Sequence, residues 1–302
     1  VYDENKARKE AEYMKKIIVT GGAGFIGSNL THALVGYGFD VHVIDNLSGG
    51  KKEKVNKNAT LHIADITNLN AIKPIFKNAS YVFHLAALPR VQYSIEFPAE
   101  SHNANVTGTL NVLLAAKEAG VKSVIYSASS SASGAQPIMP LKEKMPANPK
   151  SPYGLQKYVG ELLCKNFSVV FNLPTVCLRY FNIYGPGQSD EGAYALVIAK
   201  FLKQIKEGKS MTITGDGNQT RDFTNVKDVV RANILAMKSK KVGNGEVINI
   251  GAGKKQSVNT IAKLIGGPVK CIPARLEPKD TLADNSLARE LLGWIPEVKI
   301  ED

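Results

Sequence analysis

A tyrosine and a lysine four residues apart could form an acid–base pair. They stand in Ser151-Pro152-Tyr153-Gly-Leu-Gln-Lys157, where serine is typical of a helix cap and proline of a first helical turn. Residues four apart share one face of a helix, so a phenol would lie beside an ammonium. A free tyrosine, with a pKa of about 10, is a poor base at neutral pH, but a neighbouring cation stabilises its phenolate. Tyr153 is therefore a candidate base, although an isolated Tyr-x-x-x-Lys is common on surface helices.

A run of serines precedes this helix in the chain. Ser127-Ala-Ser129-Ser130-Ser131 follows a predicted strand at 123–129. Hydroxyls at the carboxyl end of a strand can orient a substrate or relay a proton to a base, whereas a serine run elsewhere is often a flexible turn. We expect Ser129 to take part in the chemistry with Tyr153 and Lys157.

A glycine-rich turn predicts a dinucleotide site. Gly21-Gly-Ala-Gly24-Phe-Ile-Gly27 follows a predicted strand at 16–20 and opens a helix. Glycines at such a turn let the backbone approach a pyrophosphate at the helix N-terminus. Asp45 ends the next strand, where a carboxylate accepts the adenosine ribose hydroxyls and repels a 2′-phosphate. NAD is favoured over NADP, although Lys51, Lys52, Lys54 and Lys57 keep NADP open. Asp65, after the third strand, either lies near adenine or caps a helix.

The elements that must position these residues alternate between strands and helices. Short β-branched runs predict strands at 16–20, 41–45, 60–65, 81–87, 123–129 and 175–181, with helical patterns between them. This order is typical of an α/β fold with a Rossmann-type, doubly wound parallel sheet that binds ligands at the carboxyl ends of its strands. After residue 185 the sequence changes to the loop-like segments GPGQSDEGAYA and GDGNQTRDF, followed by a helix-rich tail. We therefore expect an N-terminal extension at 1–13, a mainly NAD-binding domain at 14–185 and a smaller C-terminal substrate lobe at 186–302, some of whose strands and helices return to the first domain.

Composition narrows the classes of function. The 302 residues are 44% apolar and 22% charged, which indicates a chain with a large core. There is no apolar run long enough for a membrane span, and the first thirteen residues are charged rather than signal-like, so we expect a cytoplasmic protein. Cys164, Cys177 and Cys271 lack metal-ligand spacing, which predicts no metal. The net charge of +11 is scattered, which argues against nucleic acid and suits a phosphate-rich small molecule.

Eight ordered motifs resemble the extended short-chain dehydrogenase/reductase superfamily and, within it, the NAD-dependent nucleotide-sugar 4-epimerases. The resemblance covers nearly everything from Met14 onward. Its carriers are TGGAGFIG, Asp45-Asn46-Leu47-Ser48, His84-Leu-Ala-Ala87, the Ser127–Ser131 run, Ser151 to Lys157, Arg179-Tyr-Phe-Asn182-Ile-Tyr-Gly-Pro186, Gly215-Asp-Gly-Asn-Gln-Thr-Arg221-Asp-Phe and Ala283-Asp-Asn-Ser.

The resemblance implies a role for each matching residue. It makes Tyr153 the base, Lys157 its partner and a ligand of the nicotinamide ribose, and Ser129 the hydroxyl at the sugar. The residues implied for NAD are Gly21, Gly24, Phe25, Ile26, Asp45, Asn46, Ser48, Gly50, Asp65, Ile66, Leu85, Ala86, Ala87, Asn105, Ser127, Tyr153, Lys157 and Tyr180. Those implied for a UDP-sugar substrate are Arg90, Ser129, Ser130, Ser131, Tyr153, Asn182, Ala193, Tyr194, Arg221, Arg275 and Thr281, with Asn182, Arg221 and Arg275 at the diphosphate.

The serine loop and Thr281 narrow the reaction that the resemblance implies. Related dehydratases have Thr-Asp-Glu in the loop, and Ser130 and Ser131 lack the carboxylates that elimination needs. A small residue at Thr281 is typical of 4-epimerases that admit 2-acetamido sugars. We expect 4-epimerisation of UDP-N-acetylglucosamine and UDP-glucose. A UDP-glucose-restricted epimerase, a UDP-glucuronate decarboxylase and a non-enzymatic NAD-binding sensor or scaffold remain alternatives. The last of these would be expected to have lost the Tyr-Lys pair.

Two departures from the family lie near the sugar, and the resemblance also implies an assembly. Ser133-Gly-Ala135 replaces the usual Tyr-Gly-Asp, which predicts a wider sugar pocket. Arg90 faces the sugar region by motif position and adds a cation, which suits an acidic or bulky sugar substituent or a surface ion pair. Helices predicted at 99–119 and 152–171 would form a homodimer face, but their apolar residues could equally be core.

Overall fold

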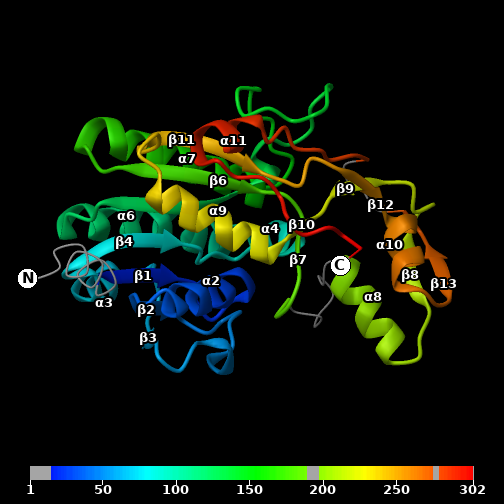
Figure 1. Cartoon of the computed structure of the whole chain (residues 1–302), viewed down its shortest axis with the longest axis horizontal. Coiled ribbons are helices and arrows are strands. Elements are labelled where there is room, and N and C mark those ends of the chain that lie inside the picture. The colour runs from blue at the N-terminus through cyan, green and yellow to red at the C-terminus, as the bar shows by residue number, and fades with distance from the viewer. Residues whose placement is uncertain (1–14, 189–196, 275–278, 302) are drawn as a thin grey trace, which may run out of the picture.

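Seven parallel strands form the central sheet of the protein. The computed structural model describes residues 15–188, 197–274 and 279–301. The strands lie in the order β3 (Thr60–Ile63), β2 (Asp40–Asp45), β1 (Lys16–Thr20), β4 (Ala79–His84), β5 (Ser123–Ser129), β6 (Thr175–Tyr180) and β11 (Asn244–Ile250) (Figure 1). The chain reverses its direction of travel across the sheet between β1 and β4, which is where doubly wound folds bind their ligands. The predicted Rossmann-type fold is confirmed.

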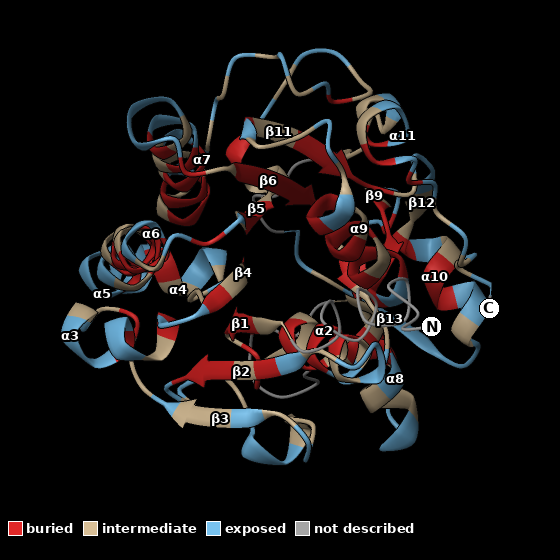
Figure 2. Cartoon of the chain, turned by 60° about the vertical axis from the view of Figure 1, so that its left-hand side comes forward, coloured by how far each residue is buried: buried red, intermediate tan, exposed pale blue. Residues whose placement is uncertain are grey.

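Helices cover both faces of this sheet. One face carries α2 (Phe25–Gly36), α9 (Val226–Lys238) and α11 (Ser286–Leu292), and the other carries α3 (Leu69–Ile72), α6 (Gly108–Ala119) and α7 (Pro152–Phe171). Figure 2 shows the buried strands lying between these two layers. Between β4 and α6 the chain forms α4 (Val91–Glu96), α5 (Pro98–His102) and a π-helical turn (Asn103–Thr107), and short 3-10 turns occur at Lys52–Lys54, Lys73–Phe76 and Ser130–Ala132.

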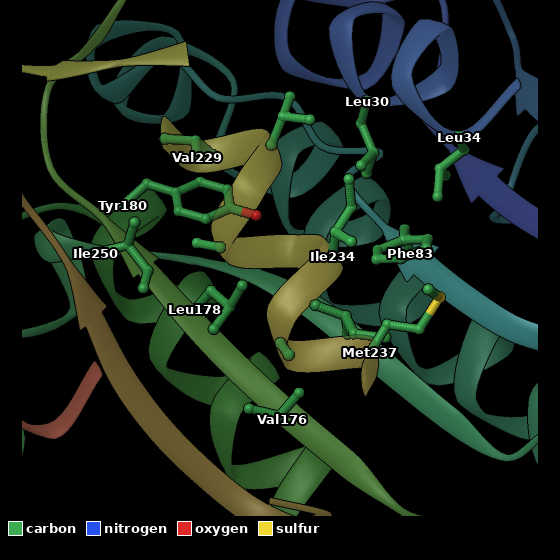
Figure 3. Close-up of a cluster of buried hydrophobic side chains, with 14 of the residues drawn as sticks. Leu30, Leu34, Phe83, Val176, Leu178, Tyr180, Val229, Ile234, Met237 and Ile250 are labelled. Carbon is green, nitrogen blue, oxygen red and sulfur yellow. The ribbon is translucent and has the colours of Figure 1, made fainter. Parts of the chain in front are cut away.

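Strand alternation divides the core into two clusters. Ile17 and Val19 of β1 point to the α2 and α9 side, whereas Ile18 between them points to the α6 and α7 side. Successive side chains of a strand point to opposite faces, so a strand covered on both faces must be apolar throughout. Figure 3 shows the first cluster, in which Leu30 and Leu34 of α2 pack near side chains of α9 and of the strands.

A smaller lobe lies beside the carboxyl edge of the sheet, at the right-hand end of Figure 1. It contains α8 (Val197–Lys206), α10 (Val258–Ile265) and three two-stranded pairs: β8 (Met211–Thr214) with β13 (Val269–Ile272), β9 (Thr220–Asp222) with β12 (Lys255–Ser257), and β7 (Ile183–Tyr184) with β10 (Thr224–Asn225). Phe201, Met211 and Ile261 belong to its own apolar cluster. The lobe therefore has a core separate from that of the large sheet.

The predicted strands occur with small shifts at their ends. The fourth strand ends at His84 rather than at residue 87. The Leu85 N–H still donates to the Thr20 carbonyl, but the Ala86 N–H donates to the Thr20 hydroxyl, at 3.2 Å, and not to the backbone of β1. The chain after residue 185 also returns α9, β11 and α11 to the large sheet. The division at residue 185 stays a prediction, and the extension at 1–13 lies outside the described residues. In the part of the chain that the structure describes, no helix has the length and apolar character needed to cross a membrane.

Candidate active site

A cavity of about 820 Å³ follows the carboxyl ends of the strands and continues into the small lobe. Because the strands are parallel, the segments after β3, β2, β1, β4, β5 and β6 meet it in that spatial order. Asp65 and Asp45 therefore border one end, Tyr153 and Ser129 the middle, and Arg221 the lobe end. A volume of this size suits ligands larger than a single sugar.

The glycine turn brings the backbone of β1 against the loop after β4. Gly21 has φ +72°, and a Cβ built there would lie 2.6 Å from the Ala86 nitrogen. Only glycine combines that conformation with so close an approach. The first turn of α2 then faces the cavity through Gly24, Phe25 and Ile26. Its unpaired N–H groups and the positive end of the helix dipole suit a pyrophosphate.

Asp45 and Asp65 shape the end of the cavity near β2 and β3. Asp45 is 8% exposed, and its carboxylate accepts the N–H groups of Ala23 at 3.0 Å and Leu47 at 2.8 Å. A carboxylate has about four acceptor positions, so it can still accept ribose hydroxyls. Burial opposes ionisation of Asp65, but hydrogen bonds from Thr67 and Asn46 outweigh it and lower the pKa of the Asp65 carboxyl. The Asp65 carboxylate thus stabilises the turn after β3 by accepting the Thr67 N–H, and Asp65 also lines the cavity.

The first turn of α7 places Tyr153 in the cavity. The Ser151 hydroxyl caps the helix by accepting the Gly154 N–H at 3.1 Å, and Pro152 is the first helical residue, as the sequence predicts. A Cβ at Gly154 would lie 2.5 Å from the Ser131 carbonyl oxygen. Glycine at this position lets the helix start directly against the serine loop. Tyr153 and Ser129 consequently face each other across that contact.

The Ser129 hydroxyl acts on the Tyr153 phenol and lowers its pKa against the larger effect of burial. The Ser129 oxygen also accepts the Ser131 N–H at 3.2 Å. With its oxygen accepting from the backbone, the Ser129 O–H can donate to the phenol oxygen. Burial raises the pKa of Tyr153 to about 12, while the Ser129 hydroxyl and the charge of Arg90 act in the opposite direction. The phenolate therefore depends on nearby donors and cations.

Lys157 lies one turn further along α7. Its Nζ donates to the Ser127 carbonyl oxygen at 2.7 Å and stands 4.9 Å from the centre of the Tyr126 ring. Burial lowers the pKa of Lys157 to about 8, and Cys164 and Glu161 act against that shift. The ammonium has three protons, so the contact with Ser127 leaves others for a ligand in the cavity.

The buried pair of Arg179 and Glu161 holds Ser133 behind the serine loop. Arg179 binds the Glu161 carboxylate through two hydrogen bonds of 2.7 Å and donates a third, of 3.2 Å, to the Ser133 hydroxyl. Ser133 is 2% exposed and is not among the cavity-lining residues. The Ser133 side chain thus lies in the interior behind the serine loop, and the wider sugar pocket expected from Ser133-Gly-Ala135 stays a prediction.

Polar contacts hold the lobe end of the cavity together. Asn182, with φ +36°, donates from its amide to the Asp222 carbonyl at 3.1 Å and to the Thr281 hydroxyl at 3.2 Å. Arg221 donates to the carbonyls of Thr220 and Lys279 and lines the cavity. The Asp222 carboxylate accepts the N–H groups of Gly253 and Ala283, both at 3.0 Å. Segments distant in sequence thus converge around Arg221.

The structure brings most of the predicted site residues to one cavity. Among the described residues, Asn105 and Thr281 are the exceptions. The Asn105 amide binds Leu88 through its N–H and carbonyl and also donates to Gln156 at 2.8 Å, so it supports the loop after β4. Thr281 lies behind Asn182. Their predicted contacts with ligands stay predictions, and Ala193, Tyr194 and Arg275 lie outside the described residues.

Sequence reasoning missed several residues that line the lobe end. They come from α8, β8, the residues on either side of β9 and the start of α10, and they include Lys200, Thr212, Thr214, Gln219, Phe223 and Val258. Phe223 and Gln219 stand inside the quoted Gly215 to Phe223 motif, which was the available signal. The other residues stand in no recognisable motif. They line the cavity only because separate short elements pack together, which the local sequence does not reveal.

The cavity suits NAD on the evidence of its own residues. A close glycine turn faces the helix terminus, an acidic residue follows β2, and the Lys157 ammonium is buried with one described acceptor, Ser127. These groups match a pyrophosphate, an unphosphorylated ribose and a second ribose, respectively. The carboxylate of Asp45 favours NAD over NADP, because it would repel a 2′-phosphate.

Comparison with known proteins gives the family. The NAD dependent epimerase/dehydratase family matches residues 17–251. UDP-glucose 4-epimerase of Mycolicibacterium smegmatis is 35% identical over 306 residues, covering 95% of each chain. The structure of UDP-glucose 4-epimerase from Thermotoga maritima with UDP-glucose is 38% identical, with a TM-score of 0.89 and 95% coverage of each chain.

A second solved structure is that of UDP-N-acetylglucosamine 4-epimerase from Methanobrevibacter ruminantium M1 in complex with UDP-N-acetylmuramic acid. It is 39% identical, with a TM-score of 0.89, over 94% of this chain and 93% of that chain. The family match spans the glycine turn, Asp45 and the Tyr153–Lys157 pair, all of which meet in the cavity. This chain belongs to the NAD-dependent epimerase/dehydratase family, and NAD is its cofactor.

Proposed function

We propose that the protein interconverts UDP-hexoses that differ in configuration at C4, through a 4-keto sugar. Its substrates are UDP-N-acetylglucosamine and UDP-N-acetylgalactosamine, and also UDP-glucose and UDP-galactose. The observation that carries the proposal is the buried Tyr153 phenol, which lines one cavity together with Ser129 and Lys157. The similar epimerases from M. smegmatis, T. maritima and M. ruminantium, all named for UDP-sugars, support the substrate class.

Tyr153 removes the proton of the sugar 4-hydroxyl in this proposal. Ser129 donates to the phenol oxygen and so favours the phenolate, and Lys157 supplies a cation one turn away. With a pKa of about 8, Lys157 remains largely protonated at pH 7. Tyr153 later returns the proton to the same oxygen, so the base is regenerated in each cycle.

Inversion requires the keto sugar to present its other face while the nucleotide stays bound. NAD supplies the chemistry by accepting a hydride from C4 and returning it to the opposite face. Arg221 and Asn182 would hold the diphosphate during this rotation, since a guanidinium pairs well with phosphate oxygens. Both residues belong to the lobe end of the cavity, away from Tyr153.

The serine loop favours epimerisation over elimination. Ser130 and Ser131 line the cavity next to Ser129 and Tyr153. Neither side chain can act as the carboxylic acid or carboxylate that loss of water from C5 and C6 needs. Loss of water from the 4-keto sugar would therefore find no carboxylate in this loop.

Proton NMR of the purified protein with each UDP-sugar tests the function. UDP-N-acetylglucosamine and UDP-glucose are incubated separately, first without and then with added NAD, and the sugar H1 and H4 signals are followed. Galacto-configured product from both substrates is the expected result. Conversion of UDP-glucose alone would contradict the small gate at Thr281. UDP-glucuronate is incubated in the same way. Release of carbon dioxide from it, without conversion of either hexose, would show that the protein is a decarboxylase and not a 4-epimerase.

The proposed assembly is a homodimer through α6 and α7. Val112 and Leu113 of α6 are fully buried within the chain, whereas Leu155, Leu162 and Val169 of α7 are exposed. The α7 residues therefore remain available for a partner, and those two α6 residues do not. Light scattering after size-exclusion chromatography should give twice the chain mass, and Leu162→Glu should reduce it toward the mass of one chain.

A further inference from the structure

Arg90 brings a second cation to the reacting end of the cavity. It precedes α4 in an extended conformation and lines the cavity together with Tyr153, Ser129 and Lys157. The side chain is partly buried, so water screens its charge less than at a fully exposed site. Neither the proton transfer by Tyr153 nor the binding of the diphosphate, as described above, uses this guanidinium.

Ser94 fixes the start of α4 to the start of α7. The Tyr153 N–H donates to the Ser94 hydroxyl oxygen at 3.0 Å, and that hydroxyl donates to the Val91 carbonyl at 2.6 Å. The Ser94 N–H donates to the Arg90 carbonyl at 3.0 Å. Ser94 is fully buried, so these contacts are shielded from water. The backbones of Arg90 and Tyr153 are thus linked through one residue, and both residues line the same cavity.

Several other groups surround Tyr153 in addition to Arg90. Ser129 and Tyr126 approach from β5, and Lys157 lies on α7, with Glu100 of α5 at the cavity wall. Burial raises the pKa of Tyr153, and the positive charge of Arg90 opposes that shift. Reciprocally, burial lowers the pKa of Arg90 while Tyr153 raises it. The groups that act on Lys157 instead are Cys164, Glu161 and Cys177.

Arg90 and Lys157 differ in how firmly they keep their charge. Lys157 begins to lose its proton near pH 8. An arginine keeps its charge across this range, because its unperturbed pKa is above 12. Above pH 8, where Lys157 loses its charge, Arg90 would still provide a positive charge to the Tyr153 phenolate.

We propose that Arg90 stabilises the Tyr153 phenolate and so acts, with Lys157, as a second cation of the base. The inference rests on the proposed function, in which Tyr153 takes the sugar proton. Arg90 works through Tyr153 and is in that sense a positioning residue. Removing its charge should shift the acid limb of the pH–rate profile upward, because a smaller fraction of Tyr153 is then ionised at neutral pH.

Arg90→Met and Arg90→Lys test this, each in NAD-loaded protein. Arg90→Met should raise the apparent pKa of Tyr153 by about one unit and lower kcat at pH 7 by about ten-fold. Arg90→Lys should stay within about three-fold of the natural protein, because it keeps the charge. Arg289→Met, which removes an exposed arginine of α11, should change neither quantity.

The phenol of Tyr153 can be titrated without substrate. The chain has 11 tyrosines, so the ultraviolet tyrosinate signal of each variant is compared with the same variant carrying Tyr153→Phe. An unchanged Tyr153 titration in folded Arg90→Met overturns the proposal, and so does a Tyr153 that stays protonated in the natural protein throughout its folded pH range. A loss confined to KM would make Arg90 a substrate ligand instead. Failure of the natural protein to convert any UDP-sugar would overturn the proposed function, while the titration would still decide the role of Arg90.

Discussion

The reacting end of the cavity and its lobe end are built in different ways. At the reacting end, Ser129 and Tyr153 stand on the last residue of β5 and the first turn of α7, which belong to the main sheet and its covering helix. At the lobe end, Arg221 stands on β9, a strand of three residues, and its neighbours are held by side-chain contacts to the backbone.

This difference suggests that the reacting end determines the rate of the chemistry and that the lobe end determines substrate binding. Regular elements with large apolar cores hold their termini within narrow limits, which a proton transfer between Tyr153 and a sugar hydroxyl requires. Short strands joined by polar contacts can change with fewer consequences for the core. We expect variants at the reacting end to affect turnover, and variants at the lobe end to affect binding and the pH dependence of stability.

Tyr153→Phe should have the largest effect. It removes the phenol oxygen and keeps the ring, so turnover of UDP-glucose should fall by about 10³-fold or more. Thermal unfolding should change little, because the ring packing remains. Tyr158→Phe is a matched control on the same helix, since Tyr158 does not line the cavity among the described residues, and it should keep full activity. Comparable kcat values for the two variants would show that Tyr153 is not the base.

The reacting end was largely predictable from the sequence. The cap at Ser151, the first-turn Pro152 and the four-residue spacing to Lys157 are local features, and the structure contains each of them. The positions of the first six strands of the main sheet followed from apolar runs, because a sheet buried on both faces must be apolar throughout. The turn of Ser133 toward Arg179 was missed, since it depends on a charge 46 residues away in sequence.

The lobe end and the far edge of the sheet were less predictable. β11 completes the main sheet next to β6 but follows the lobe's α8 and β8 in the chain. A seven-residue segment does not reveal which of two cores it joins. Thr281 illustrates the same limit, because its motif position indicated a gate, whereas its hydroxyl accepts a hydrogen bond from Asn182. Contacts between distant short segments decide such placements.

Arg221→Met should affect binding more than turnover. The loss of a charge-assisted contact with a diphosphate costs about 1.5 to 3 kcal/mol, so KM should rise roughly ten- to a hundred-fold. kcat should change by less than about three-fold, since the reacting end keeps its own supports. Steady-state kinetics with UDP-glucose checks this, with Arg289→Met as the arginine control. A ten- to hundred-fold fall in kcat with no change in KM would contradict the proposal that the reacting end controls turnover and the lobe end controls binding.

Asp222→Asn should have the smallest effect, on the pH dependence of stability. Burial raises the pKa of Asp222 to about 6 from 3.8, while the N–H groups of Ala283 and Gly253 act against that shift. Because the folded state holds the proton more tightly, the contribution of Asp222 to stability is complete below pH 3.8 and is lost as pH rises through 6. A shift of about two pKa units corresponds to about 3 kcal/mol.

Urea unfolding at several pH values between 4 and 7 measures this contribution. The substituted asparagine would keep a carbonyl oxygen for the two N–H groups but would not titrate, so the stability of the natural protein relative to Asp222→Asn should fall as pH rises. Asp216→Asn should show no such fall between pH 4 and 7, because hydrogen bonds from Asn218 lower the pKa of Asp216 below 3.8, and its contribution to stability is lost only at lower pH. Parallel stability curves for the natural protein and Asp222→Asn would mean that the charge of Asp222 is fully compensated by the N–H groups around it. The lobe end would then be as rigidly preorganised as the reacting end, and the contrast between them would rest on Arg221 alone.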